Sequence, residues 1–312
     1  MQYRSDLQIL RGIAIILVIG YHISSDVFRS GFFGVDIFFV LSGFLITKIY
    51  QNYNLKKYVL NRFKRILPAY FVSLIFITVI SSIFLNLKEF NEVVREYFFA
   101  SAFLSNIGFW AKNSYFNNSN FYPLLHFWSL SIEMQFYIIY PFIFYFFYKR
   151  YFLLFFLLIA SFMCCAIIIN VSPKTAFYFI PFRIWEFLFG MLICKINIKN
   201  KFLYSKFNYI LLLPLLYICF TNTSYESHNF YYSHPGLKSF LVCFNTSLII
   251  LLGLPKIIFL KLPNLIFEKI GLISYSLYLY HFPIIIFYNY IPFEGNKYNL
   301  INYTDLLICL ET

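Results

Sequence analysis

Apolar segments long enough to cross a bilayer recur along the whole chain, with short polar segments between them. A helix needs about 20 apolar residues to cross the hydrocarbon core. The expected crossings lie at about residues 7–22, 31–47, 67–85, 123–148, 151–170, 178–195, 207–221, 237–254 and 271–290. A tenth would begin near Tyr303, where only TDLLICLET remains, so the helix at about 303–312 is expected to be truncated. The pattern predicts an all-α polytopic transmembrane helical bundle of about 9–10 membrane spans.

Two features between the second and fourth crossings add detail to this pattern. Pro68 suits the first turn of the third helix, because proline lacks the N–H that an interior position would use. Arg62 and Arg65 would then share a face at the cytoplasmic foot of that helix. The apolar stretch Tyr97–Trp110 is too short to span and is expected to be re-entrant or interfacial.

The composition excludes a water-soluble protein. Of the 312 residues, 61% are hydrophobic and only 12% are charged, and the mean hydropathy is +0.70. We expect one membrane-embedded domain over residues 1–312 with no additional soluble domain. The first helix is expected to be a retained signal anchor, because no small-residue cleavage site follows it. The six cysteines show no Cys-x-x-Cys or Cys/His ligand spacing, so they are interpreted as small lipid-embedded residues, and no metal site is predicted.

The net charge of +12 would suggest a nucleic-acid partner in a soluble protein, but here the basic residues have another meaning. Most Lys and Arg residues fall in alternate loops, as the positive-inside rule describes. Their distribution places the N-terminus in the cytoplasm and predicts a multi-pass protein of the cell (cytoplasmic or inner) membrane. The expected surroundings are the lipid bilayer, with no nucleic-acid partner.

The first two crossings carry ionisable residues, which at membrane depth indicate a functional site by default. Arg11 and His22 are eleven positions apart, so they share one face of the first helix, about 16 Å from each other along its axis. His22 ends this helix and Asp36 begins the next, so antiparallel packing can bring them within reach. A carboxylate that accepts one imidazole N–H makes the other nitrogen a better base, as deprotonation of an alcohol requires. The alternative is a hydrogen bond that only helps the helices to pack.

Arg11, Arg62 and Arg65 form a second group, which the topology places toward the cytoplasm. The planar guanidinium makes two hydrogen bonds at once and therefore suits phosphate recognition. Arginines beside a membrane also serve topology or contact anionic lipid. This alternative is strongest for Arg62 and Arg65, whereas the deeper position of Arg11 favours a functional role.

The segment HFWSLSIEMQFY places several polar residues on one helix face. His126, Ser129 and Glu133 recur there at helical spacing. Glu133 could bond an acceptor hydroxyl, assist proton transfer or hold a cation, and a structural pair with Arg183 is the alternative. Trp128 fits an anchor at the membrane interface.

Two further clusters place polar residues within apolar runs. In RIWEF, Arg183 and Glu186 are three positions apart on one helix, so they can simply neutralise each other. In SYSLYLYHFP, Tyr280 and His281 belong to a polar helix that is expected to line a cavity. His281 is a second candidate base.

Other possible chemistries have little support in the sequence. The outer-loop histidines His228 and His234 are predicted to have no specific role. The chain contains no Walker loop, dinucleotide-binding fingerprint, HExxH or G-x-S-x-G motif. ATP hydrolysis, zinc proteolysis and ordinary serine hydrolysis are therefore not indicated.

Seven motifs follow one another in a fixed order along the chain. They are an arginine and a histidine with ten residues between them, then GFFGVDIFFVLSGFLIT, RFKRILPAY, SNIGFW, PLLHFWSLSIEMQFYIIYP, RIWEF and GLISYSLYLYHFP. This series resembles the acyltransferase-3 family of integral membrane acyltransferases. Each motif is weak alone, but the series from about Tyr3 to Ile291 is specific. The branch that it resembles O-acetylates lipopolysaccharide O-antigen and related surface glycans.

The resemblance implies an O-acetyltransferase with a multi-pass fold of acyltransferase-3 type. It implies acetyl-CoA or another short acyl-CoA as co-substrate, no permanently bound cofactor, and a glycan or lipid-linked glycan as acceptor. By motif position, the resemblance implies that His22 is the catalytic histidine, Arg11 its motif partner and Asp36 the acidic residue associated with it. It also implies that Arg62 and Arg65 form the family's RxxR pair. Glu133 would be the acidic residue of the WSLS-x-E motif. The chain departs from the family at Met134, where many members carry a second glutamate, and in its short C-terminal end.

These observations give one mechanistic hypothesis and two alternatives. The arginines would hold the CoA phosphates, while the phosphopantetheine arm, comparable in length to the ~16 Å between Arg11 and His22, brings the thioester to His22. His22, oriented by Asp36, would deprotonate a sugar hydroxyl or take the acyl group itself. The alternatives are a proton-coupled carrier or channel lined by the same charges, and a noncatalytic helper in glycan export. We find no internal inverted repeat of the kind that carriers often show.

Overall fold

The described part of the protein is helical. The computed structural model describes residues 4–50, 55–112, 121–196, 205–224, 227–254 and 261–290, without the side chains of residues 55–59, 206, 261 and 262. These residues form helices joined by turns, with one isolated bridge between Ser224 and Ser233. The predicted all-α class is therefore confirmed, and the crossing predicted near Tyr303 lies outside the described residues.

Five helices in the described part of the chain are long and apolar enough to cross a membrane. They are α1 (Ser5–Ile23), α2 (Phe33–Tyr50), α3 (Leu55–Phe84), α6 (Phe127–Ile143) with its continuation η1 (Phe144–Tyr148), and α7 (Tyr151–Val171). A sixth candidate crossing is the pair formed by α12 (Lys261–Leu272) and α13 (Ser274–Tyr288), which is bent by 78°. The predicted polytopic bundle is thus confirmed.

Shorter elements occupy the remaining predicted segments. Three of them are apolar: α9 (Ile184–Ile193), η3 (Lys206–Leu211) with α10 (Leu212–Phe220), and α11 (Leu237–Leu252). The others are α4 (Leu87–Ser101), α5 (Ser105–Lys112), α8 (Pro173–Tyr178) and η2 (Ile180–Phe182). The stretch predicted to be too short to span is divided between α4 and α5.

Two predicted boundaries are wrong. Helix α3 begins at Leu55, so Pro68 lies inside the helix and not in its first turn. Proline removes only one backbone hydrogen bond, and the helix continues through it. Because α3 begins before them, Arg62 and Arg65 lie within this helix, where their side chains can reach the interior of the bundle.

The crossing predicted at residues 178–195 is interrupted by η2, which has a proline at its start, before α9 begins.

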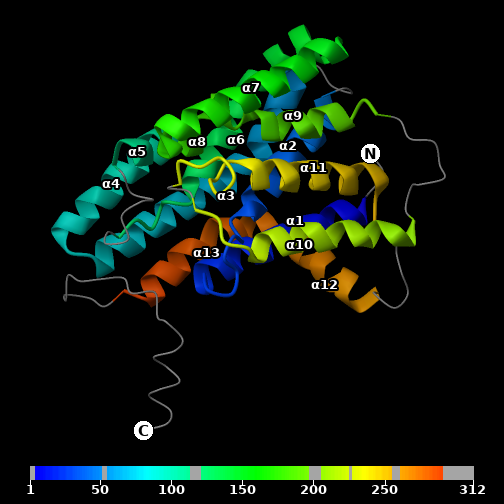
Figure 1. The fold of residues 1–312 in the computed structure, drawn as a ribbon. Coiled ribbons are helices and arrows are strands. Elements are labelled where there is room, and N and C mark those ends of the chain that lie inside the picture. Colours follow the sequence, from blue (N-terminus) through cyan, green and yellow to red (C-terminus); the bar gives the residue numbers. More distant parts are fainter. Residues whose placement is uncertain are drawn as a thin grey trace.

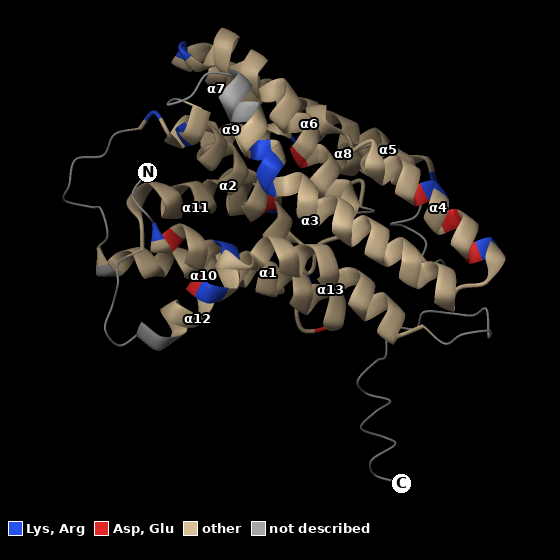
Figure 2. Cartoon of the chain, turned by 180° about the vertical axis from the view of Figure 1, so that it is seen from behind, with Lys and Arg blue, Asp and Glu red and all other residues tan. Residues whose placement is uncertain are grey.

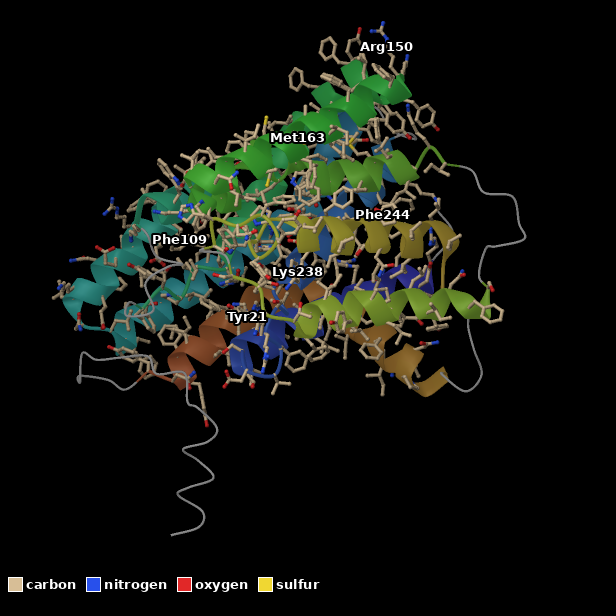
Figure 3. The ribbon with its side chains drawn as sticks, in the orientation of Figure 1. Tyr21, Phe109, Arg150, Met163, Lys238 and Phe244 are labelled. Atoms are coloured by element: carbon tan, nitrogen blue, oxygen red, sulfur yellow. The ribbon has the colours of Figure 1, made fainter. Side chains whose placement is uncertain are left out.

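Helix α2 is the centre of the bundle. It packs between α9 and α1, while α7 lies beyond α9 and α12 lies beyond α1 (Figure 1). In α2, 72% of the membrane-crossing window is buried inside the protein, whereas in α7 only 28% is. Met163 on α7 and Phe244 on α11 project from the outer surface (Figure 3). Uncharged residues cover most of the long helices, and a block of basic residues interrupts them on α3 (Figure 2). Such an apolar exterior suits contact with lipid.

Two glycines allow close contact between the backbones of α2 and α9. A Cβ atom on Gly43 would lie 2.0 Å from the carbonyl oxygen of Phe187, and a Cβ atom on Gly190 would lie 2.1 Å from that of Val40. Small residues at helix crossings permit such approach within membranes. The contact holds together the two helices that carry Asp36 and Glu186.

Replacing Gly190 with valine should separate α2 from α9, because the new side chain would collide with backbone atoms that cannot rotate away. Overpacking of this kind costs about 1–3 kcal/mol. We expect a lower midpoint of thermal unfolding for the purified protein in detergent. Met163→Val on the exposed face of α7 is the matched control, and an unchanged midpoint for Gly190→Val would contradict the close contact.

Candidate active site

Three arginines line one cavity inside the bundle. Arg11 comes from α1, and Arg62 and Arg65 come from α3; the cavity measures about 330 Å³. We call it the arginine cavity. Three guanidinium groups around one space form a site suited to an anion that carries phosphate groups. The polar residues that also line it include Ser42, Ser129, Glu133, Tyr137, Ser274, Tyr275, Ser276 and Tyr278.

Glu133 of α6 belongs to the arginine cavity. Its Oε1 accepts hydrogen bonds from the hydroxyl groups of Ser42 and Tyr137. Arg62 donates to the Tyr137 hydroxyl over 2.6 Å, so Tyr137 joins the carboxylate to the cation. The suggested pair between Glu133 and Arg183 is wrong, because Arg183 bonds carboxylates on α2 and α9. Glu133 therefore lies on the arginine side of the site.

A second cavity, of about 20 Å³, has three histidines in its wall: His22, His126 and His234. We call it the histidine cavity. Val35 and Tyr278 line both cavities, so these side chains form a wall that the two cavities share. Helix α1 contributes to each, with Arg11 in one and His22 in the other. The other wall residues of the histidine cavity are apolar or aromatic: Val18, Phe32, Leu125, Trp128, Phe177 and Phe282.

His22 is held by its own helix. Its Nδ1 lies 2.8 Å from the carbonyl oxygen of Val18. Because a carbonyl only accepts, Nδ1 carries the proton in this bond, and Nε2 of the neutral ring has a free lone pair. The ring packs against His281 and Phe282, with ring centroids 5.2 and 4.9 Å away. His22 thus faces the interior of the bundle with the tautomer that a base or nucleophile needs.

Asp36 does not orient His22, so this predicted pair is wrong. The Asp36 carboxylate lies 3.1 Å from Nη2 of Arg183 and 3.0 Å from Nε2 of His234. All three side chains are buried. The cause is the loop between α10 and α11, which brings His234 to the start of α2 from 198 positions away in the sequence. The prediction that His234 has no specific role is wrong for the same reason.

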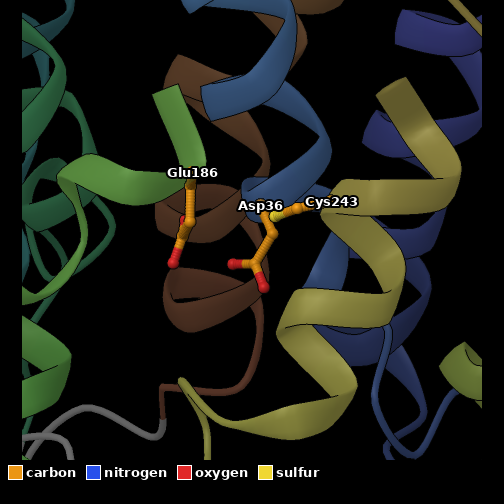
Figure 4. Close-up of side chains that lie close together, drawn as sticks. All are labelled: Asp36, Glu186 and Cys243. Atoms are coloured by element: carbon orange, nitrogen blue, oxygen red, sulfur yellow. The ribbon is translucent and has the colours of Figure 1, made fainter. Parts of the chain in front are cut away.

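Arg183 is the cation of this second charged group. Its Nε lies 3.2 Å from Oε1 of Glu186, which confirms the predicted pair, and it also bridges to Asp36. Figure 4 shows the two carboxylates beside the sulfur of Cys243, and the possible ligand atoms of these three residues lie within 4.8 Å of one another. The guanidinium already supplies positive charge to both carboxylates. We therefore assign the group to Arg183 and not to a metal ion.

His126 and His281 complete a cluster of imidazoles around His22. His126 donates from Nε2 to the carbonyl oxygen of Leu279 at 3.0 Å, and His281 donates from Nδ1 to that of Tyr278 at 2.8 Å. Their ring centroids are 5.7 Å apart. The other ring nitrogen of each is buried and lacks a hydrogen-bond partner among the described residues. Both histidines can therefore accept a hydrogen bond from a bound molecule.

Three other predicted site residues have different surroundings. Trp128 is only 4% exposed and packs on Phe177, so its prediction as an interface anchor is wrong. Ser129 lies 2.5 Å from the hydroxyl of Tyr278, at the wall between the cavities. Tyr280 does not line either of these two cavities, and its ring centroid lies 6.0 Å from that of Phe76 on α3.

Sequence reasoning missed His234. The residue is 1% exposed although it lies in a polar loop. Helical periodicity relates residues within one helix, and it carries no signal for a contact between a loop and a distant helix. Cys243 was misplaced in a similar way, because it is buried in the protein and does not face lipid.

Comparisons with known proteins agree on one family. The sequence profile of a family described as “Acyltransferase domain” matches residues 4–303. The Listeria monocytogenes protein “Peptidoglycan O-acetyltransferase OatA” is 30% identical over 311 residues, which cover 91% of this chain and 50% of that protein. A Haemophilus influenzae protein named only as uncharacterized is 34% identical over 237 residues, which cover 69% of this chain and 96% of its own.

The chain spans only part of several relatives. It covers half of the Listeria protein, and Staphylococcus aureus relatives are 40% identical over 153 residues, which cover 46% of this chain and 25% of theirs. No solved structure matches this chain. The similarity therefore concerns the matched regions alone.

Proposed function

This chain belongs to the acyltransferase-3 family, and from that premise we propose that it is a membrane-bound O-acyltransferase. It moves an acetyl or other short acyl group from acyl-CoA, with acetyl-CoA as the expected donor, to a hydroxyl of a cell-surface or exported glycan. O-antigen, capsule and exopolysaccharide are candidate acceptors. The relative named as a peptidoglycan O-acetyltransferase adds peptidoglycan to them.

The observation that carries this proposal is that the two cavities are neighbours, with Val35 and Tyr278 in the wall between them. The arginine cavity has the charge to hold the phosphates of CoA, and the histidine cavity has the unprotonated nitrogen of His22. Arg11 and His22 lie on one uninterrupted helix, about 16 Å apart by helical rise, a distance that an extended phosphopantetheine arm can bridge. A donor bound at one end can therefore present its thioester at the other.

The proposed orientation places the arginine cavity toward the cytoplasm. Basic residues favour the cytoplasmic ends of spans. Arg11 lies near the N-terminal end of α1, which puts the N-terminus on the side from which acyl-CoA is supplied, in the cell membrane. His22 lies near the opposite end of α1, so the acceptor glycan arrives from the outer side.

In this proposal His22 attacks the thioester carbonyl through Nε2 or deprotonates the acceptor hydroxyl. Either role needs the lone pair that the Nδ1–H bond to Val18 fixes on the far side of the ring. The Glu133 carboxylate accepts a hydrogen bond from the Tyr137 hydroxyl, which in turn accepts one from Arg62. In this proposal these contacts position Arg62 beside the donor.

The direct test uses the purified chain in vesicles. Radiolabelled acetyl-CoA is supplied together with soluble peptidoglycan fragments or O-antigen oligosaccharides. Label on a glycan supports the enzyme. Gradient-driven flux without label on any glycan supports a carrier instead, and binding without either supports a noncatalytic helper.

Substituting the arginines should weaken binding of the donor. We expect Arg11→Ala and Arg65→Ala each to raise KM for acetyl-CoA about 10–100-fold, because each loses a hydrogen bond to a charged group worth about 1.5–3 kcal/mol. Initial-rate kinetics over a range of acetyl-CoA concentrations measures this. Lys149→Ala is the control, since Lys149 is an exposed basic residue outside the cavity.

A donor without the 3′-phosphate sharpens this test. If one of the arginines binds the 3′-phosphate, substitution of that arginine should raise KM for acetyl-CoA but should raise KM for acetyl-dephospho-CoA only a little, because this donor already lacks the phosphate. Unchanged KM in both variants, with either donor, would contradict a phosphate site in the arginine cavity.

A further inference from the structure

A carboxylate–imidazole pair does exist in this protein, but its imidazole is His234. Asp36 Oδ1 and Oδ2 lie 3.0 and 3.1 Å from Nε2 of His234, and the two side chains are 0% and 1% exposed. We propose that Asp36 and His234 form the base that takes the proton of the acceptor hydroxyl, opposite an acyl group carried by His22. This inference rests on the proposed function and assigns a second histidine to its reaction.

The hydrogen bond to Asp36 fixes the tautomer of His234. A carboxylate accepts, so Nε2 carries the proton and Nδ1 has the lone pair. Nδ1 is buried and has no hydrogen-bond partner in the part of the chain that the structure describes. An orphaned buried nitrogen costs about 1–3 kcal/mol, so an incoming O–H donor would relieve a cost that the empty protein bears.

The surroundings of His234 favour a neutral ring that can gain a proton. Burial lowers the pKa of His234 below its ordinary value, although the Asp36 carboxylate opposes this. Nη2 of Arg183 also donates to Oδ1 of Asp36 at 3.1 Å, which fixes the carboxylate in place. When His234 gains a proton, the adjacent carboxylate stabilises the resulting cation, as in other carboxylate–histidine pairs.

The histidine cavity has room for the reacting hydroxyl. Its volume of about 20 Å³ exceeds the roughly 10–15 Å³ that one water-sized group needs. His22 and His234 both line it, so a hydroxyl that enters this cavity has both imidazoles in the surrounding wall. The aromatic side chains of Phe32 and Phe177 line the same cavity.

The loop that carries His234 also shapes the outer surface. Asn222, Thr223, Ser224 and Tyr232 line a polar depression of about 580 Å³ together with Ser25, Asp26 and Arg29 from the turn between α1 and α2. Sugars offer many hydroxyl groups, and polar side chains of this kind can bond them. A glycan that rests there is near the loop that presents the base.

Acyl transfer proceeds in two steps, capture by His22 and release to the acceptor. Nε2 of His22 forms a bond to the thioester carbonyl carbon, the C–S bond breaks, and the CoA thiolate takes one proton from water. The acceptor oxygen then bonds to the same carbon while its proton passes to Nδ1 of His234. The C–N bond breaks and returns its electron pair to Nε2 of His22. His234 finally releases one proton to water, so the sum is acyl-CoA and alcohol giving ester and CoA.

The test separates acyl capture from transfer with two acceptors. Hydroxylamine attacks an acylated histidine without help from a base, whereas a sugar hydroxyl needs one. His234→Gln keeps an N–H for Asp36 and removes the basic nitrogen. We expect it to retain formation of acetohydroxamate from acetyl-CoA within about threefold, and to lose glycan O-acetylation by about 10²–10⁴-fold, the usual contribution of a positioned base. His228→Gln is the control, because His228 is exposed in the same loop region and bonds only a backbone carbonyl in the described structure.

Two results would overturn the inference. One is glycan acetylation at the rate of the unchanged protein in His234→Gln; the other is equal loss of both reactions in a protein that still elutes as a folded species. If His234→Gln does not fold, His234→Ala is assayed with added imidazole, and failure of imidazole to restore glycan acetylation counts against the assignment. An unchanged protein that makes neither product would instead defeat the proposed function as a whole.

Discussion

His22→Ala is expected to abolish acyl transfer while the protein remains inserted and folded. The substitution removes the nitrogen whose lone pair faces the interior of the bundle, and it removes no contact that joins α1 to a distant charged group. Loss of a positioned acid or base lowers a rate by about 10²–10⁴-fold. The measurement is the rate of transfer of radiolabelled acetyl groups in vesicles, with KM for acetyl-CoA determined in parallel.

The kinetic pattern distinguishes His22 from the arginines. We expect His22→Ala to lower kcat with little change in donor affinity, because the proposed site for the CoA phosphates is the arginine cavity, which His22 does not line. His228→Ala serves as a matched histidine control on the surface. Full activity of His22→Ala would remove His22 from the reaction.

Arg183→Met is expected to cause the largest loss of stability. Its guanidinium is completely buried and lies 3.1 Å from Asp36 and 3.2 Å from Glu186. Removing it leaves two carboxylates buried without their cation, and breaking a buried pair in this way costs about 3–5 kcal/mol. Thermal unfolding in detergent should show a strongly lowered midpoint, together with a smaller yield of monodisperse protein.

A compensating variant tests the cause. Adding Asp36→Asn and Glu186→Gln to Arg183→Met removes both charges that the arginine balances, so much of the lost stability should return. Activity should stay low, because His234 then lacks the carboxylate that holds it. Arg150→Met is the control, since Arg150 is exposed at the start of α7 (Figure 3). If the triple variant is no more stable than Arg183→Met, uncompensated charge is not the cause.

Much of the site could be assembled from helical spacing. Arg11 and His22 lie on one helix, and Arg62 and Arg65 share a cavity, as their positions predicted. The polar face of α6 likewise runs from His126 in one cavity to Glu133 in the other. These relations hold because they arise within single helices, where geometry follows from position.

The pairing of Asp36 could not be assembled in this way. Proximity in the sequence favoured His22 as the partner of Asp36, because neighbouring antiparallel helices are expected to place their adjoining ends together. The structure gives Asp36 to Arg183 and His234, which come from segments nearly 150 and 200 positions away. Burial selects such partners, since a carboxylate removed from water needs hydrogen bonds from whichever donors the packed fold can supply.

The sequence alone determined that this is an all-α membrane protein and that one helix carries both Arg11 and His22. Those features follow from composition and from the fixed rise and rotation of a helix, which are local properties. Only the tertiary structure decided which carboxylate serves which cation and which histidine, and that the two cavities share a wall at Val35 and Tyr278. Such contacts depend on how distant helices and loops pack, and no spacing along the chain encodes them.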